Sequence, residues 1–223
     1  MSTACPLAGY IGGKWYLRRT ICPLIDANEH TAYVEPFIGM ANVFLGRDRR
    51  RPVEVINDRN GDVSTLFRVA QRHPAALCDA IRLQTGSRSD YERLFATPPE
   101  TLTDIERAAR FLVLRKLTFA GKDPYAAGFA TSTTTAKTFD APETMRRIEA
   151  LHDRLARVTV ENLDFIDCLR RYDRPTTFFY IDPPYWGCTH LYREGGFSQS
   201  RFTEIAEALQ KLRGQWLVSI NDT

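Results

Sequence analysis

The hydrophobic and polar positions of the chain form two alternating patterns. Short β-branched and aromatic runs that end abruptly in polar or turn residues predict buried strands. The three strongest runs are Thr31–Phe37, Pro52–Asp58 and Thr176–Asp182, and two weaker ones are Val158–Asn162 and Gln215–Ile220. Segments with helical spacing separate most of them, at Ala41–Arg47, Phe165–Arg171 and Arg201–Leu212. Strand alternating with helix predicts an α/β fold with a parallel, doubly wound sheet.

The stretch between Gly61 and Arg154 has a different, predominantly helical pattern. It contains no convincing strand, and its candidate helices are Asp62–Arg72, Pro74–Gln84, Asp90–Phe95 and Thr101–Leu117. Within it, Phe119–Thr138 combines two glycines, a proline and a run of small hydroxyl residues, which predicts an exposed loop or β-hairpin. We therefore expect residues 1–60 and 155–223 to form a sheet domain, with residues 61–154 inserted as a helical subdomain.

Composition narrows the function only slightly. The 223 residues carry a net charge of +3, which permits a polyanionic partner without requiring one. The five cysteines include no C-x-x-C pair and the four histidines show no ligand spacing, so we expect no disulfide framework, no metal site and a cytoplasmic location. No apolar run approaches the roughly 20 residues that span a bilayer, which predicts no membrane insertion. The arginine-rich run Arg47–Arg51 is interpreted as a solvated face, with a nucleic-acid contact as the alternative.

The segment Phe178–Tyr185 carries the sharpest chemical signal. A hydrophobic strand delivers an acid, two prolines and an aromatic residue to its carboxyl end, where ligands bind in open α/β sheets. Consecutive prolines restrict φ and lack N–H groups, so the carbonyls of Asp182 and Pro183 project rigidly and remain free to accept hydrogen bonds. A carboxylate, a fixed carbonyl and an aromatic face suit a flat ring with an exocyclic amine. The alternative is a strand that ends in a turn, with Asp182 as a helix cap.

The tetrapeptide Asp182-Pro183-Pro184-Tyr185 resembles the D-P-P-Y signature of amino-methyltransferases that modify exocyclic nitrogens. Further segments are similar, in order, to motifs of the Dam-like DNA adenine N6-methyltransferases: Tyr10–Lys14, Tyr33–Phe44, Ile56–Asp58, Glu161–Phe165 and Leu217–Asp222. The resemblance runs from Tyr10 to Thr223. It implies a Rossmann-like methyltransferase fold with the helical insert as a target-recognition subdomain. The implied reaction is methyl transfer from S-adenosylmethionine to the N6 atom of a flipped-out adenine in DNA.

The resemblance also implies which residues hold the cofactor. Gly39 allows the loop after the first strand to approach the methionine part closely, and this loop lacks the full G-x-G-x-x-G of dehydrogenases. Asp58 would accept from the ribose hydroxyls, Asp164 from the adenine amine, and Lys14 would pair with the methionyl carboxylate. Each acid could instead be a helix cap. The complete set assigned to the cofactor is Tyr10, Gly13, Lys14, Glu35, Pro36, Phe37, Gly39, Asn42, Asp58, Asp164, Phe165 and Asp182.

Catalytic and DNA-binding roles are implied in the same way. Asp182 and the Pro183 carbonyl would accept from adenine N6 and align its lone pair with the methyl group, while Tyr185 would stack on the flipped base. The hairpin at Phe119–Thr138 would read the DNA sequence, and the residues expected to contact DNA are Phe119, Lys122, Tyr125 and Phe129. Pro124 stands where GATC-specific members carry an arginine, which predicts another target or relaxed specificity.

Two alternatives remain open from the sequence. The same fold could methylate cytosine N4 or RNA, because both offer an exocyclic amine. The chain could also be a non-catalytic remnant that binds the cofactor or DNA, since it stops at Asn221-Asp222-Thr223 where Dam-like enzymes continue. An edge strand at Gln215–Ile220 would then favour dimerisation through that strand, coverage by the N-terminal segment, or marginal stability.

Overall fold

The computed structural model describes residues 4–118, 123–131, 139–185 and 197–221. The chain folds as two compact units. The helical unit comprises Met1–Gly13 and Thr65–Ala156, and the sheet unit comprises Lys14–Ser64 and Arg157–Thr223. The N-terminal residues, which were expected with the strands, group instead with the helices. Two contacts explain this difference: the Arg115 guanidinium lies 4.4 Å above the Tyr10 ring, and Arg147 donates to the Pro6 carbonyl at 3.3 Å.

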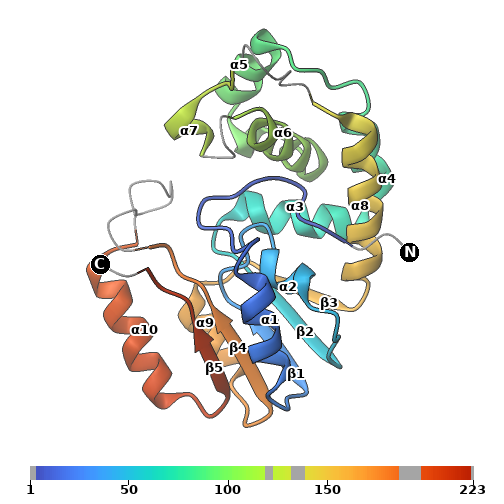
Figure 1. The fold of residues 1–223 in the computed structure, drawn as a ribbon. Coiled ribbons are helices and arrows are strands. Elements are labelled where there is room, and N and C mark those ends of the chain that lie inside the picture. The colour runs from blue at the N-terminus through green and yellow to red at the C-terminus, as the bar shows by residue number, and fades with distance from the viewer. Residues whose placement is uncertain (1–3, 119–122, 132–138, 186–196, 222–223) are drawn as a thin grey trace. The chain divides into compact units, whose positions relative to one another are not determined.

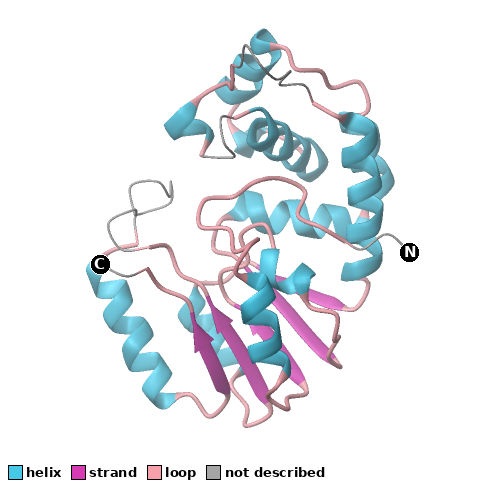
Figure 2. Ribbon diagram, viewed as in Figure 1, coloured by secondary structure: helices cyan, strands magenta, loops and turns pink. Residues whose placement is uncertain are grey.

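Five parallel strands form the sheet, and their order is β3-β2-β1-β4-β5 (Figures 1 and 2). Their bounds are Ala32–Glu35 for β1, Val53–Asn57 for β2, Val158–Glu161 for β3, Thr177–Ile181 for β4 and Gln215–Val218 for β5. Each lies within the run that predicted it, so all five predicted strands are confirmed. The three strongest runs are the central strands β1, β2 and β4, which read as nearly continuous apolar segments because both of their faces are covered.

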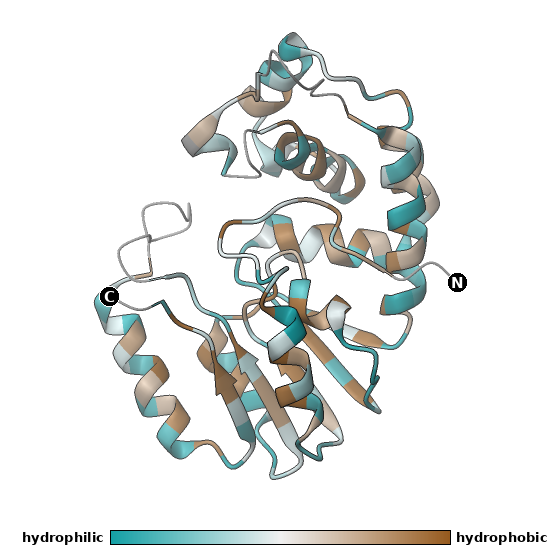
Figure 3. Ribbon diagram, in the orientation of Figure 1, coloured by the Kyte–Doolittle hydropathy of each residue, from teal (hydrophilic) through white to brown (hydrophobic). Residues whose placement is uncertain are grey.

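Helices α9 (Phe165–Tyr172) and α10 (Gln199–Lys211) cover one face of the sheet. Alternate residues of the central strands point toward them and join their apolar sides in one core: Val34, Val55, Phe179, Ile181, Phe165, Cys168, Leu169 and Ile205. In Figure 3 the strands are mostly hydrophobic, whereas α10 alternates between hydrophobic and hydrophilic residues. Amphipathic helices therefore supply the cover that apolar strands need.

Helices α1 (Arg18–Asp26) and α2 (Asn42–Gly46) cover the opposite face. Tyr33 and Glu35 point to this face, because they alternate along β1 with the core residue between them. Arg47, which directly follows α2, places its guanidinium 3.7 Å from the centroid of the Tyr33 ring. With helices on both faces, the predicted doubly wound α/β fold is confirmed.

Arg47 is buried, which corrects the interpretation of the arginine run as a solvated face. Its side chain is 0% exposed and forms ion pairs with Asp26 at 3.1 Å and Glu54 at 3.6 Å. Below the guanidinium, the Tyr33 hydroxyl donates to Glu35 Oε1 at 2.6 Å. Acids from α1 and β2 make this burial possible, because a buried charge needs a partner. Glu35, which was expected in the cofactor set, accepts from a side chain of its own strand, and its role toward the cofactor stays a prediction.

The helical unit contains six α-helices and one 3₁₀ turn within its described residues. They are α3 (Gly61–Arg72, which begins in the sheet unit), α4 (Pro74–Ile81), α5 (Arg88–Ala96), η1 (Pro99–Thr101), α6 (Asp104–Leu117), α7 (Pro124–Ala127) and α8 (Ala141–Leu155). The four predicted helices are confirmed at α3 to α6. Helix α6 starts later than predicted because Thr103 and Glu106 form a capping box. Helix α8 was not predicted, although the Asp140 side chain marks its start by accepting from the N–H of Glu143.

The segment predicted as an exposed loop or hairpin is partly helical and partly buried. Residues 119–122 and 132–138 of it lie outside the described ranges. In the part that is described, α7 forms one helical turn, and Thr118 and Phe129 form an isolated antiparallel bridge beside it. Asp123 is only 8% exposed, because its carboxylate accepts from Arg115 at 3.1 Å and from the Tyr125 N–H at 2.9 Å. The expectation of exposure is therefore wrong at Asp123.

Strand β5 lies at an edge of the five-stranded sheet, as expected for Gln215–Ile220. Trp216 on this strand is 47% exposed. Unpaired strand edges favour association with other strands. Dimerisation through β5 stays a prediction.

Candidate active site

The candidate site lies at the carboxyl edge of the sheet. The strand order reverses between β1 and β4, because the chain continues from β1 to β2 and β3 on one side and from β4 to β5 on the other. Ligands of open α/β folds bind outside the carboxyl ends of the strands at such a reversal. Predicted site residues follow four of the strands: Pro36 after β1, Asp58 after β2, Asp164 after β3 and Asp182 after β4.

Lys14 reaches this edge from the segment that precedes α1. Its Nζ lies 2.6 and 2.7 Å from the two carboxylate oxygens of Asp182, and 4.5 Å from the centroid of the Tyr185 ring. The side chains of Lys14 and Asp182 are 3% and 18% exposed. Residues 168 positions apart in sequence thus form one group, which we name the Lys14–Asp182–Tyr185 cluster.

Lys14 contacts a different partner from the one that the resemblance implied. Its ammonium is engaged by Asp182, whereas the expectation was the methionyl carboxylate of the cofactor. An ammonium beside a largely buried carboxylate offsets the cost of burying that charge. In this structure Lys14 therefore acts on Asp182, and its pairing with a cofactor stays a prediction.

The pKa of Asp182 is raised to about 6 by burial, although the charge of Lys14 and hydrogen bonds from Lys14 and the Ser219 side chain lower it. Ser219 directly follows β5 and donates its N–H to the Ile181 carbonyl at 2.9 Å. The parallel register of β4 and β5 therefore brings Ser219 beside Asp182. Sequence reasoning did not assign Ser219 a role, although it lies in one of the matched motifs. Asp182 is ionised at neutral pH and can accept from an N–H donor.

The loop between β1 and α2 has the backbone strain of a ligand-binding segment. Gly39 has φ 49° and Ala41 has φ 60°, both in the left-handed region that favours glycine. Ala41 is fully buried and is the only non-glycine residue with positive φ in the described ranges. Strain of this kind persists where the surrounding structure imposes it, and it is common at binding sites. The loop after the first strand joins it to a helix as expected, and that helix begins at Asn42, one residue later than predicted.

Asp58 connects this loop to the end of β2. Its Oδ2 accepts from the Gly39 N–H at 2.9 Å, and its Oδ1 accepts from the Asn60 N–H at 2.9 Å. These two hydrogen bonds fix the orientation of the carboxylate at the carboxyl edge of the sheet. The position fits an acid that binds a ribose, and it also orders the loop.

Asn57 is a structural residue of the site that sequence reasoning did not assign. Its side-chain amide donates to the carbonyls of Pro36 at 2.8 Å and Leu163 at 3.1 Å, and its Oδ1 accepts from the Leu163 N–H at 2.8 Å. These three hydrogen bonds hold the loops after β1 and β3 together. The sequence did carry a signal for this role: Asn57 is a side-chain amide at the end of a buried strand, next to Asp58.

Asp164 is both a helix cap and an ion-pair partner. Its Oδ1 accepts from the Ile166 N–H at 3.0 Å at the start of α9, and its Oδ2 contacts the guanidinium of Arg201. Burial raises its pKa, but the hydrogen bonds from Arg201 and Ile166, together with the charges of Arg201 and Arg59, bring the net pKa below its ordinary value. The capping alternative is therefore correct for Asp164, and a role in adenine binding stays a prediction.

Aromatic rings gather beside Asp164. The centroids of Phe37 and Phe165 are 5.2 Å apart, and Phe197 lies 5.8 Å from Phe37 and 5.9 Å from Phe165. Arg201 covers the Phe165 ring at 4.3 Å. Flat faces next to a carboxylate suit a planar heterocycle with an amine. Phe197 and Arg201 were not assigned roles from the sequence.

The expected DNA-contacting residues belong to the helical unit. Tyr125 on α7 is 43% exposed; its ring lies 4.6 Å from that of Phe95, and its hydroxyl accepts from Arg110 at 3.3 Å. Phe129 packs edge-on against Tyr91 at 5.4 Å and carries Arg88 above its ring at 4.7 Å. Phe119 and Lys122 lie outside the described residues. Two of the predicted cofactor residues, Tyr10 and Gly13, also belong to this unit.

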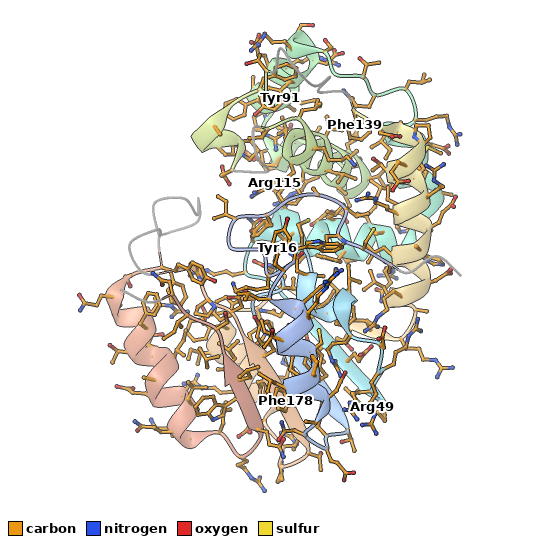
Figure 4. All side chains as sticks on the ribbon, viewed as in Figure 1. Tyr16, Arg49, Tyr91, Arg115, Phe139 and Phe178 are labelled. Atoms are coloured by element: carbon orange, nitrogen blue, oxygen red, sulfur yellow. The ribbon has the colours of Figure 1, made fainter. Side chains whose placement is uncertain are left out.

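Arg115 is another residue that the sequence did not single out. It is 4% exposed, and its ion pair with Asp123 at 3.1 Å anchors the start of α7 (Arg115 is labelled in Figure 4). Since Asp123 also accepts from the N–H of Tyr125, one buried carboxylate joins the start of α7 to α6.

In the described parts of the chain, no group of three or more His, Cys, Asp or Glu side chains is placed to hold a metal ion. Among the helices of those same ranges, none combines the length and apolarity needed to span a bilayer.

Comparison with known proteins supplies the identity. A search of curated proteins found no match. A family model described as D12 class N6 adenine-specific DNA methyltransferase matches residues 10–223. This match includes the Lys14–Asp182–Tyr185 cluster, the strained loop after β1 and the acids after β2 and β3. Because the match covers nearly the whole chain and the fold agrees with it, the protein belongs to the D12 class N6 adenine-specific DNA methyltransferases.

Proposed function

We propose that Asp182 and the carbonyl of Pro183 hold the amine of an extruded adenine while Tyr185 stacks on its ring. The observation that supports this role is the Lys14–Asp182–Tyr185 cluster, which places a largely buried, ionised carboxylate beside an aromatic face at the strand-order reversal. The family acts on adenine N6 in DNA, which selects this reaction over the cytosine and RNA alternatives. Since adenine N6 is enclosed in the duplex, the base must leave the stack at a cost of a few kcal/mol.

The family's methyl donor is S-adenosylmethionine, which supplies an electrophilic methyl group when bound. The donor set at the carboxyl edge fits this molecule. Asp58 suits the ribose hydroxyls, and the ring pair Phe37 and Phe165 beside Asp164 suits the adenine. The strained loop at Gly39 permits close backbone approach to the methionine part of the cofactor.

The protein's own residues then prepare the adenine amine for attack. N6 is a poor nucleophile because its lone pair is delocalised into the ring. Two hydrogen bonds from the amine, to the Asp182 carboxylate and the Pro183 carbonyl, favour the pyramidal form in which the lone pair points along the transfer axis. Positioning of this kind can contribute about 7–11 kcal/mol relative to a bimolecular encounter. Lys14 keeps Asp182 ionised, so that it can accept.

Methyl transfer by the wild-type protein should fall on acidification with an apparent pKa near 6. The pKa of Asp182 is about 6, and the ionised form, which predominates above it, is the form that accepts from N6. The Lys14 charge lowers this pKa, so Lys14→Met should move the acidic limb of kcat/KM to higher pH, whereas Lys14→Arg should leave it near that of the wild type. If the acidic limb of kcat/KM lay at the same pH in Lys14→Met and in the wild type, Lys14 would not be the residue that lowers the pKa of Asp182.

Replacing Asp58 by Ala should weaken cofactor binding by about 1.5–3 kcal/mol, because a hydrogen bond to a charged group is lost. Isothermal titration calorimetry with S-adenosylmethionine measures the change. Asp167→Ala is the matched control, since Asp167 is 62% exposed on α9 and lies in no part of the proposed site. Equal affinities of the Asp58 variant and the wild type would contradict the assignment.

The proposed reaction is tested by methyl transfer from labelled cofactor to mixed-sequence duplex DNA, followed by digestion to nucleosides. We expect N6-methyladenine as the product. Label in N4-methylcytosine would favour the cytosine alternative, and transfer to RNA but not to DNA in a parallel assay would favour the RNA alternative. Cofactor binding without any transfer would favour the non-catalytic remnant.

A further inference from the structure

Three consecutive large apolar residues lie exposed directly after the buried Lys14. Trp15 is 42% exposed, Tyr16 88% and Leu17 54% (Tyr16 is labelled in Figure 4). We name these three residues the Trp15–Leu17 patch. Single exposed apolar residues are ordinary, but neighbouring ones on a surface are typical of an interaction site.

The patch is not required to build the fold. Helix α1, which follows it, buries Ile21, Cys22 and Ile25 on its inner side. Trp15 is instead held at the surface by Arg18, whose guanidinium lies 3.3 Å from the centroid of the Trp15 ring. Arg18 in turn packs closely along Gly46, where an added Cβ would lie 2.9 Å from its Cδ. The aromatic surface is therefore preorganised while it remains exposed.

The charge around the patch is positive. Lys14 is neutralised by Asp182, but from Trp15 to Ile25 the sequence contains Arg18 and Arg19 and no acid. The first acid, Asp26, is already engaged by Arg47 at 3.1 Å and Arg51 at 3.6 Å. Arg19 is exposed, and in the described parts of the chain no acidic side chain forms an ion pair with Arg18 or Arg19. Aromatic faces together with unpaired basic groups are the surface that nucleic acids bind.

The position of the patch relative to catalysis favours DNA over other partners. Lys14 contacts Asp182, so Trp15 and Tyr16 follow within two residues of the cluster proposed to hold the extruded base. We expect a duplex whose adenine occupies that cluster to pass near this surface, because Trp15 and Tyr16 directly follow Lys14 in the chain. A second copy of this basic segment would bring like charges together.

We propose that the Trp15–Leu17 patch and Arg19 bind the DNA duplex beside the extruded adenine. This inference rests on the proposed function. Tyr16 stacks on or packs against exposed bases and sugars, and Arg19 contacts a backbone phosphate. The surface belongs to the sheet unit, so it adds a DNA contact separate from the recognition segment around α7.

The test compares Tyr16→Ala and Arg19→Ala with the wild type in binding to a fluorescent DNA duplex, at several salt concentrations. Loss of a stacking contact should weaken the Tyr16 variant at least about 5-fold. Loss of one phosphate contact should reduce the slope of log affinity against log salt by about 0.9 in the Arg19 variant. Leu83→Ala, at an 89% exposed apolar residue after α4, and Arg170→Ala, at a 77% exposed arginine on α9, are the matched controls and should match the wild type.

Cofactor affinity and sedimentation of each variant complete the experiment. We expect unchanged cofactor binding and an unchanged oligomeric state. Wild-type DNA affinity and salt slope in both patch variants would overturn the inference, as would a change in self-association with unchanged DNA binding. A failure of the proposed function would look different: the wild type would bind DNA but transfer no methyl group to it.

Discussion

Replacing Asp182 by Asn should reduce methyl transfer by about 10²- to 10³-fold, because the charged acceptor aimed at the reacting amine is lost. The measurement is single-turnover transfer from labelled cofactor to DNA. Cofactor and DNA affinities should change much less than the rate. A variant that retains wild-type turnover would remove Asp182 from the mechanism.

The same substitution should also destabilise the protein, because Lys14 is 3% exposed and loses its counter-charge. Leaving one member of a buried pair without its partner costs about 3 kcal/mol. The double variant Lys14→Met with Asp182→Asn removes both charges and should recover much of that stability in urea unfolding. It should recover none of the activity. This comparison separates a chemical role from a folding defect, and recovery of turnover in the double variant would contradict the chemical role.

Wild-type protein should methylate a target other than GATC, or a relaxed set of sites. Pro124 is in the first turn of α7, where proline is favoured because the first N–H groups of a helix have no internal partner. GATC-specific members carry an arginine at this position, and a bidentate arginine–guanine contact contributes about 1–3 kcal/mol of discrimination. Proline offers no donor, so we expect this contact to be absent.

Sequencing of methylated positions in a random DNA library measures the preference. Pro124→Arg should introduce a preference for guanine at one position of about 5- to 150-fold, which corresponds to the same contact. The buried Asp123–Arg115 pair, which sets the start of α7, is unchanged in this variant. Ala127→Arg, at the other end of α7, is the control for added charge. Strict methylation of GATC by the wild type would contradict this interpretation of Pro124.

The sequence alone determined the sheet and which acids lie at its carboxyl edge. The central strands are covered on both faces, so their apolar runs were readable without any tertiary information. The acids that follow β2, β3 and β4 could likewise be placed at one edge, because parallel strands end on the same side. In the described ranges three helices escaped prediction for local reasons, the first being α7, a single turn inside the segment predicted as a loop or hairpin. Pro23 interrupts the pattern of α1, and α8 starts directly after a segment rich in small hydroxyl residues, which concealed its capping signal at Asp140.

The tertiary structure decided how the residues at that edge are used. Lys14 and Asp182 are 168 positions apart, and no local pattern encodes their pairing. Ser219 comes beside Asp182 only through the register of β4 and β5, and Arg47 could be buried only because α1 and β2 bring acids to it. Residue type and spacing specify which groups a segment can offer. Which of them become partners depends on strand order and burial, since charges taken out of water pair with whatever opposite charge the fold brings within reach.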